Sequence, residues 1–196
     1  MEKYDLLRKL STKPYVTIAD VAGLLGTKPE SARVLCNRYA KEGSLIRLKN
    51  NFYLTEQRWE AAQRQELFRV ANFLQVPSYV SFLTALSLYE VTTQVQQGFF
   101  ESACLRRSKK IEARGIAFVY YKLKKELYFD FVRTDGIFLA TKEKAFMDMV
   151  YLYSFGKYAV DFGSIDPARL DKKRLKAIAI KFPARARLIM ERLCKI

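Results

Sequence analysis

Residues 15 to 54 constrain the fold of this chain more than any other segment, because they hold two short amphipathic stretches on either side of one glycine. In the first stretch, Thr17 and Asp20 have the spacing of a capping box, in which two side chains satisfy backbone N–H groups at a helix start. Apolar residues then recur at helical intervals up to Gly26, which can adopt the left-handed conformation that ends a helix. The pattern predicts a short helix followed by a tight turn.

A second helix is predicted between Thr27, in position to cap it, and Gly43, which can end it. Pro29 lies in its first turn, where proline is favoured. At 100° per residue, one face is apolar and consists of Ala32, Leu35, Cys36 and Tyr39. The opposite face comprises Lys28, Glu30, Arg33, Val34, Asn37, Arg38 and Lys41. Cations and amides of this kind read base edges and phosphates in a major groove, and we expect Arg33 and Asn37 to read bases. The alternative is the solvated face of a structural helical hairpin.

A β-hairpin is predicted next, because residues 45–48 and 52–54 alternate apolar and polar around Lys49-Asn50-Asn51. Asparagine tolerates the positive φ that a tight turn requires. We expect the apolar residues of the hairpin to pack on the helices, and its tip to contact phosphate through Arg47, Lys49, Asn50 and Asn51. Packing alone is the alternative. Helices and hairpin together predict a winged helix-turn-helix domain over residues 1–58.

The remaining residues, 59–196, are predicted to form a second domain, since half of the 196 residues are hydrophobic and can supply two small cores. Its predicted helices cover 56–75, which connects the domains, 79–89 after a cap at Ser78 or Ser81, 142–155 after Thr141, 172–182 after Asp171, and the segment from Pro183. Its predicted strands cover 99–106, 116–123, 127–133 and 136–140. The predicted fold class is α+β, with a mixed α/β second domain that has a small, largely antiparallel sheet and C-terminal helices.

The chain is strongly basic, with 35 Lys and Arg against 20 Asp and Glu and a formal charge of +15. Residues 61–196 hold 24 of these basic and 13 of these acidic residues, so most of the excess belongs to the second domain. It is concentrated in two stretches, which contain Arg106, Arg107, Lys109, Lys110, Arg114, Lys122, Lys124 and Lys125, and then Lys172, Lys173, Lys176, Arg185 and Arg187. A charge run is usually a solvated face. Beside a helix-turn-helix, we expect these stretches to contact the DNA backbone.

Nucleic acid is favoured over an anionic membrane as the polyanionic partner. The N-terminal residues lack the apolar core of a signal peptide, and no run of about 18 apolar residues is present. We therefore expect a cytoplasmic protein that does not contact the membrane. The three cysteines lie far apart among apolar neighbours, which favours buried thiols over disulfides or a metal framework.

The absence of histidine removes most enzyme classes, including Ser/His/Asp and Cys/His catalysis and His-ligated zinc. Asp130, Asp135, Glu143 and Lys144 could suggest a magnesium-dependent nuclease. However, Glu143 and Lys144 point about 100° apart on a helix, and Asp135 opens an ordinary Asp-Gly turn. We expect no catalytic residue, no cofactor and no metal. A metal-dependent nuclease or an RNA-binding protein with a winged-helix targeting domain remains the alternative.

Three segments resemble the AbiEi family of antitoxins, from bacterial type IV toxin-antitoxin and abortive infection systems. They are the end of the winged helix at Gly43-Ser-Leu-Ile-Arg-Leu-Lys-Asn-Asn-Phe-Tyr-Leu54, Pro77-Ser-Tyr-Val-Ser-Phe-Leu-Thr-Ala-Leu86, and Ala140-Thr-Lys-Glu-Lys-Ala-Phe-Met-Asp148. The chain departs from the family pattern at Asn50-Asn51, where the wing usually has a glycine, and at Tyr89-Glu90, where His-Gly often stands. The first change keeps the turn feasible.

The resemblance implies a transcriptional repressor that autoregulates its own toxin-antitoxin operon in bacteria and takes part in phage defence. It also implies a nucleotidyltransferase-like toxin as functional partner, which the protein counteracts without forming a stable complex. We expect the operator to be duplex DNA with inverted repeats that is bent on binding and filled by cooperative assembly.

Overall fold

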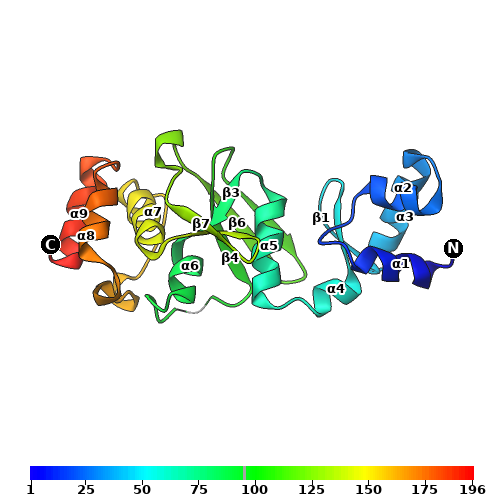
Figure 1. Ribbon diagram of the computed structural model, residues 1–196, viewed down its shortest axis with the longest axis horizontal. Helices are drawn as coiled ribbons and strands as arrows, with labels where there is room; N and C mark the ends of the chain where they lie inside the picture. Colours follow the sequence, from blue (N-terminus) through cyan, green and yellow to red (C-terminus); the bar gives the residue numbers. More distant parts are fainter. Residues whose placement is uncertain (95) are drawn as a thin grey trace. The chain divides into compact units, whose positions relative to one another are not determined.

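The computed structural model describes residues 1–94 and 96–196, which form an α+β fold of two compact units (Figure 1). Unit 1 comprises residues 1–70 and 111–115, and unit 2 comprises residues 71–110 and 116–196. The division therefore falls after Val70, later than the predicted boundary after residue 58. A turn from the middle of the chain also belongs to unit 1.

Unit 1 contains helices and a two-stranded antiparallel sheet, in the order α1 (Lys3–Ser11), α2 (Ile18–Leu25), α3 (Pro29–Lys41), β1 (Leu45–Lys49), β2 (Phe52–Thr55) and α4 (Glu56–Glu60). The helices α2 and α3 pack side by side (Figure 1). The core between the helices and the hairpin includes Leu6, Leu10, Val21, Cys36 and Tyr53. Burial of these side chains holds the helices and the hairpin together.

The caps of α2 are those predicted, and the cap of α3 is not. Thr17 and Asp20 form a reciprocal capping box, and Gly26 ends α2 at φ 62°. Thr27 does not cap α3, because Lys28 occupies the N-cap position without a side-chain hydrogen bond. The residue before a proline is restricted to extended conformations, which places Lys28 outside the helix at ψ 149° and lets α3 begin at Pro29.

The predicted hairpin is present and is attached to α2. Asn51 has φ 55°, as the turn requires, and its Oδ1 accepts a hydrogen bond of 2.7 Å from the backbone N–H of Ile18. Val16 and Tyr53 exchange backbone hydrogen bonds of 2.8 and 2.9 Å. These bonds fix the hairpin against the start of α2.

The single helix predicted over 56–75 is two helices, α4 and α5 (Arg64–Leu74). Apolar spacing continues across the break, so the sequence pattern does not reveal it. Arg58 reaches across the break and forms an ion pair with Glu66, with Nε 3.2 Å from Oε1. Trp59 is buried at the end of α4.

The six-stranded sheet has the order β5-β6-β4-β3-β8-β7. Its strands are β3 (Ser78–Val80), β4 (Phe99–Cys104), β5 (Lys109–Ala113), β6 (Ile116–Lys122), β7 (Phe131–Thr134) and β8 (Ile137–Ala140). The strand pairs β3–β4 and β7–β8 are antiparallel, whereas β4–β6 and β3–β8 are parallel. The sheet is therefore mixed, and the prediction of a largely antiparallel sheet is wrong. The strand predicted over 127–133 begins only at Phe131, because residues 125–127 form the 3-10 turn η1 (Lys125–Leu127).

The helix predicted over 79–89 is a strand followed by a shorter helix, β3 and α6 (Phe82–Leu88). Ser81 stands at the N-cap of α6, but its side chain does not cap the helix. Tyr79 and Val80 are both fully buried. A short buried strand and a buried helix have the same apolar run in sequence, which explains the error.

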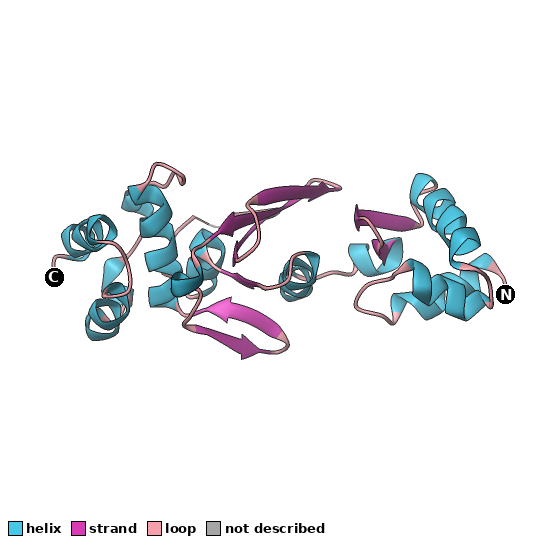
Figure 2. Ribbon diagram, turned by 90° about the horizontal axis from the view of Figure 1, so that it is seen from above, coloured by secondary structure: helices cyan, strands magenta, loops and turns pink. Residues whose placement is uncertain are grey.

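The C-terminal helices are α7 (Lys142–Ser154), α8 (Lys172–Ala179) and α9 (Ala184–Cys194), and the short turns η2 (Phe162–Ser164) and η3 (Pro167–Arg169) lie between α7 and α8. Thr141 caps α7, and Asp171 caps α8, both as predicted. Helix α7 packs against α6, α8 and α9 beside the strands (Figure 2). In the part of the chain that the structure describes, no helix combines the length and apolar character needed to cross a bilayer.

Candidate nucleic-acid interface

Six of the seven residues predicted for this surface lie on the outward face of α3, and Lys28 precedes the helix at its N-cap. Lys28, Glu30, Arg33, Val34, Asn37, Arg38 and Lys41 are exposed. The exposed fraction of Val34 is 69%, whereas Ala32, Cys36 and Tyr39 on the opposite face are buried. A surface of this kind places four long cations, an amide and an apolar side chain where a ligand can reach them.

The side chains on this face differ in their internal partners. Within the described residues, Arg33, Asn37 and Lys41 take part in no hydrogen bond or ion pair. Arg38, in contrast, lies 5.6 Å from the centre of the Tyr39 ring. Arg33 and Asn37 can therefore bind a ligand without giving up an internal contact.

The hairpin brings a further cation close to α3. Burial raises the pKa of the Tyr53 hydroxyl, and the charges of Arg47 and Arg33 oppose that rise. Arg47 Nη2 donates a hydrogen bond of 3.4 Å to Asn50 Oδ1, and Lys49 Nζ lies 5.2 Å from the centre of the Phe52 ring. Arg33 of α3 and Arg47 of β1 thus both act electrostatically on the Tyr53 hydroxyl.

Two of the predicted contact residues have structural partners instead. Asn51 is exposed, but its carbonyl oxygen is bonded to α2. Arg114 belongs to unit 1, where Nη1 lies 3.1 Å from Glu56 Oε1 and 3.3 Å from Glu60 Oε1. Its Nη2 donates a hydrogen bond of 3.2 Å to the carbonyl of Gly43. Two carboxylates pair with this guanidinium, so a contact between Arg114 and the DNA backbone, which stays a prediction, would compete with these ion pairs.

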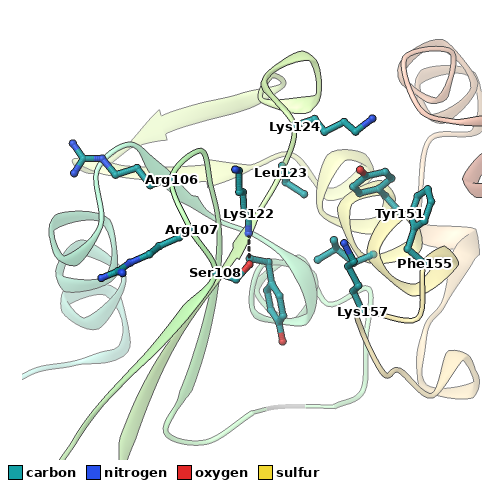
Figure 3. A pocket seen from close by; sticks show the side chains of 11 residues that line it. Arg106, Arg107, Ser108, Lys122, Leu123, Lys124, Tyr151, Phe155 and Lys157 are labelled. Atoms are coloured by element: carbon teal, nitrogen blue, oxygen red, sulfur yellow. Dashed lines mark hydrogen bonds between the residues drawn. The ribbon is translucent and has the colours of Figure 1, made fainter.

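The basic stretch between residues 106 and 125 contributes to a pocket of about 770 Å³ in unit 2 (Figure 3). Its cations are Arg106, Arg107, Lys122, Lys124 and Lys157, and its aromatic residues are Tyr121, Tyr151 and Phe155. Among the described residues that line it, none is acidic. Sequence analysis missed Lys157, Tyr151 and Phe155, because they come from parts of the chain outside the basic stretch, and it missed Tyr121, which lies within that stretch.

The other predicted cations of unit 2 lie elsewhere. Lys109 Nζ lies 5.5 Å from the centre of the Tyr120 ring, while Lys110 and Lys125 are exposed. On α8 and α9, Lys172, Lys173, Lys176 and Arg185 are exposed and Arg187 is half-buried. Arg185 lines a second cavity of about 510 Å³ together with Arg192, Tyr153 and Phe162.

Helix α7 holds a buried ion pair that sequence analysis missed. The side chains of Lys144 and Asp148 are 0% exposed and form a salt bridge with each other. Tyr79 Oη and Ser81 Oγ donate hydrogen bonds of 2.9 and 2.8 Å to Asp148 Oδ2, and Lys144 Nζ donates one of 2.8 Å to Tyr79 Oη. The i,i+4 spacing of Lys144 and Asp148 was the available signal.

Burial dominates the electrostatics of this cluster. It lowers the pKa of Lys144 and raises that of Asp148, and the ion pair opposes both changes. Lys144 Nζ also lies 5.2 Å from the centre of the Phe129 ring and 5.3 Å from that of Phe182. The cluster joins β3 to α7 and is closed to solvent.

Two of the three carboxylates of the nuclease alternative, Asp130 and Glu143, are engaged with one arginine. Arg174 Nη2 lies 2.7 Å from Asp130 Oδ1, and Arg174 Nε lies 3.7 Å from Glu143 Oε2. The remaining oxygens accept bonds from the Thr141 hydroxyl, at 2.7 Å, and from the Asp171 backbone N–H, at 3.0 Å. Across residues 1–94 and 96–196, no group of three or more His, Cys, Asp or Glu side chains could hold a metal ion.

A second buried acid lies behind the pocket. Glu101 is 2% exposed, and Tyr158 Oη donates hydrogen bonds of 2.9 Å to both of its carboxylate oxygens. Burial raises the pKa of Glu101 to about 7. Tyr121, which lines the pocket, lies near this carboxylate, and burial raises the pKa of Tyr121 to about 12.

Comparison with solved structures shows a likeness in fold. The chain is similar to the crystal structure of the RV2827C protein from Mycobacterium tuberculosis, with a TM-score of 0.63 and 11% sequence identity. The match covers 97% of this chain and 75% of that chain, so the fold is shared over nearly the whole length. No known protein family and no curated protein matches the sequence.

Proposed function

We propose that the protein binds duplex DNA in a sequence-specific manner through a winged helix-turn-helix in unit 1. The observation that carries this proposal is the outward face of α3, where Arg33 and Asn37 are exposed and without internal partners. Helix α2 packs against α3 as the first helix of such a motif does, and the β1–β2 hairpin supplies the wing.

The chemistry of the two side chains fits base recognition. An arginine can donate two hydrogen bonds to guanine, and an asparagine can exchange two with adenine. Val34, on the same face, suits contact with a thymine methyl group. Lys41, Arg47 and Lys49 carry charge around these residues, where phosphates flank a groove.

The basic surfaces of unit 2 support further contacts with the DNA backbone. Lys172, Lys173 and Lys176 are exposed on α8, and Arg185 and Arg187 lie on α9. Each phosphate that such cations neutralise releases counterions and steepens the salt dependence of binding. A net charge of +15 is consistent with contacts outside the recognition helix.

Substitutions on α3 test the proposal directly. The full chain is used to select its preferred sites from a pool of random duplexes, and the affinity for a selected site is compared with that for an unselected duplex. Losing one bidentate base contact costs about 1 to 3 kcal/mol. Arg33→Ala and Asn37→Ala should therefore weaken binding to the selected site by about 5- to 150-fold and change binding to the unselected duplex far less.

Lys9→Ala is the matched control, because Lys9 is an exposed cation on α1. It should leave the preference for the selected site unchanged. Equal losses on both duplexes for the two α3 variants would show that another face reads the bases. Failure of the pool to yield any preferred site would refute sequence-specific recognition.

A role as an autoregulating repressor that counteracts a nucleotidyltransferase-like toxin is the physiological proposal, and it depends on the family resemblance. Two of the three resembling segments supply Tyr79 and Ser81, and Lys144 and Asp148, which meet in the buried cluster. These residues therefore contribute to the core of unit 2.

The test is growth rescue in cells that express the proposed partner toxin, with the chain expressed from an unrelated promoter. Growth rescue should survive Arg33→Ala. A stable complex of the chain and the toxin that co-purifies would contradict the proposal that the chain counteracts the toxin without binding it stably.

A further inference from the structure

The pocket in unit 2 has the size and composition of a ligand site. Its volume of about 770 Å³ lies in the range of about 300 to 1,000 Å³ that small-molecule and cofactor sites occupy. Figure 3 shows Tyr151 and Phe155 together on the α7 side and Lys122 on the strand, while Lys124 extends from the segment after the strand toward the α7 side. Arg106 and Arg107 extend outward from the turn after β4.

Four of the five cations of this pocket have no internal ion pair. Lys122, Lys157, Arg106 and Arg107 form no ion pair within the described residues. Lys124 lies 3.9 Å from Glu126, which does not line the pocket. Elsewhere in the chain, Arg114 and Arg174 each face two carboxylates. Like charges around one concavity repel each other, and an anion of several charges would relieve that repulsion.

The aromatic residues of the pocket offer a surface for a planar ligand. Phe155 is 47% exposed, so its ring is accessible to a ligand. Tyr151 supports it from behind in an edge-to-face contact, with centroids 5.3 Å apart at 69°. An exposed ring held in this way is the kind of platform on which unpaired bases stack.

We propose that this pocket binds one nucleotide, with its phosphates at Lys122 and Lys124 and its base on Phe155. The orientation of the nucleotide follows from the C-terminal end of α7. The carbonyl groups of residues 151–154 carry partial negative charge there and disfavour a phosphate directly beside them. The base therefore stacks on Phe155 after the end of α7, and the phosphates lie toward Lys122 on β6, within reach of the long side chain of Lys124. This site is additional to duplex recognition by α3 and does not depend on it.

A free nucleoside triphosphate and an unpaired nucleotide in a single strand share this chemistry. Calorimetric titration of the full chain with the four ribonucleoside triphosphates, a short single-stranded RNA, the matching duplex, the nucleosides and inorganic tripolyphosphate separates them. Binding of the triphosphates identifies a free nucleotide as the ligand. Binding of the single strand alone identifies an unpaired residue of a strand.

Two substitutions separate the phosphate and base contributions. Lys122→Gln combined with Lys124→Gln should weaken binding of the nucleotide at least about tenfold, since it removes two charges at the phosphates. Phe155→Ala should weaken nucleotide binding about tenfold and leave tripolyphosphate binding unchanged, because only the stacking surface is lost. Phe155→Trp should restore or strengthen nucleotide binding.

Lys172→Gln combined with Lys173→Gln is the control, because it removes the same charge from exposed positions on α8 that do not line the pocket. It should leave nucleotide binding within about twofold of the unsubstituted chain. The proposal is overturned if tripolyphosphate binds as tightly as the triphosphates and Phe155→Ala has no effect. It is also overturned if both double variants weaken nucleotide binding equally, or if neither triphosphate nor single strand binds.

Discussion

Helices α3 and α7 have the same length, 13 residues, and both carry charged side chains along their sequence, yet the two helices use those charges in opposite ways. On α3 the cations face solvent, and Arg33 has no partner within the described residues. On α7, Glu143, Lys144 and Asp148 are buried and paired. The residue type alone therefore does not reveal whether a charged side chain on a helix lies on a ligand surface or in the core. The residues packed around it decide this.

The largest expected effect comes from breaking the buried pair on α7. Lys144→Met leaves the Asp148 carboxylate buried without its cation, which should cost about 3 to 5 kcal/mol in the free energy of unfolding. Denaturant unfolding followed by circular dichroism measures it. Arg33→Ala on α3 should change the same quantity by less than about 0.5 kcal/mol.

The double variant Lys144→Met, Asp148→Leu is the control for this prediction. Removing both charges together should recover most of the loss, since neither ion is then buried alone. A single variant as stable as the unsubstituted chain would mean that the pair does not hold β3 and α7 together.

The next effect concerns Glu101, a buried charge of unit 2 whose hydrogen bonds come from hydroxyl and backbone groups. Its pKa is about 7 in the folded chain and 4.5 ordinarily. The folded state therefore binds the proton more tightly than the unfolded state. Between pH 4.5 and 7 the stability contributed by this group falls as pH rises, by about 3 kcal/mol in total.

Glu101→Gln should flatten that part of the pH profile, because glutamine does not ionise. The measurement is the free energy of unfolding at pH 4.5, 6 and 8 for both chains. If the difference between the two chains were constant across the three values, Glu101 would not titrate between them.

The fold of unit 1 could be predicted from the sequence further than that of unit 2, for a physical reason. The caps of α2, the turn at Asn51 and the two faces of α3 depend on residues a few positions apart. In unit 2, β3 pairs with β4 and with β8, which lie far along the chain, and no local pattern specifies that order. The pocket likewise combines residues from the β4–β5 turn, β6 and the end of α7, so only part of it was predicted.

A smaller change in stability is expected at the hairpin turn, where substitutions of Asn50 and Asn51 can be compared. Asn51→Ala removes the bond to Ile18 and places alanine at a φ of 55°, and should cost about 1 to 2 kcal/mol. Asn51→Gly keeps the turn and should lose less. Asn50→Ala, at an exposed position, should be close to neutral. Denaturant unfolding followed by circular dichroism measures all three variants. A large loss from Asn50→Ala with none from Asn51→Ala would contradict the attachment of the hairpin to α2.

The smallest expected effect distinguishes Arg114 from the other cations of the basic stretches. Its ion pairs with Glu56 and Glu60 are partly exposed, and such pairs contribute about 0 to 1 kcal/mol. Arg114→Ala should therefore lower stability by no more than about 1 kcal/mol. Because this guanidinium is already neutralised, the slope of log affinity against log salt for a selected duplex should not change.

Lys172→Ala, which removes an exposed cation on α8, should reduce that slope by about 0.9 if Lys172 contacts a phosphate. A reduced slope for Arg114→Ala would mean that Arg114 leaves its carboxylates when DNA binds, and that internal pairing is no guide to which cations contact the backbone.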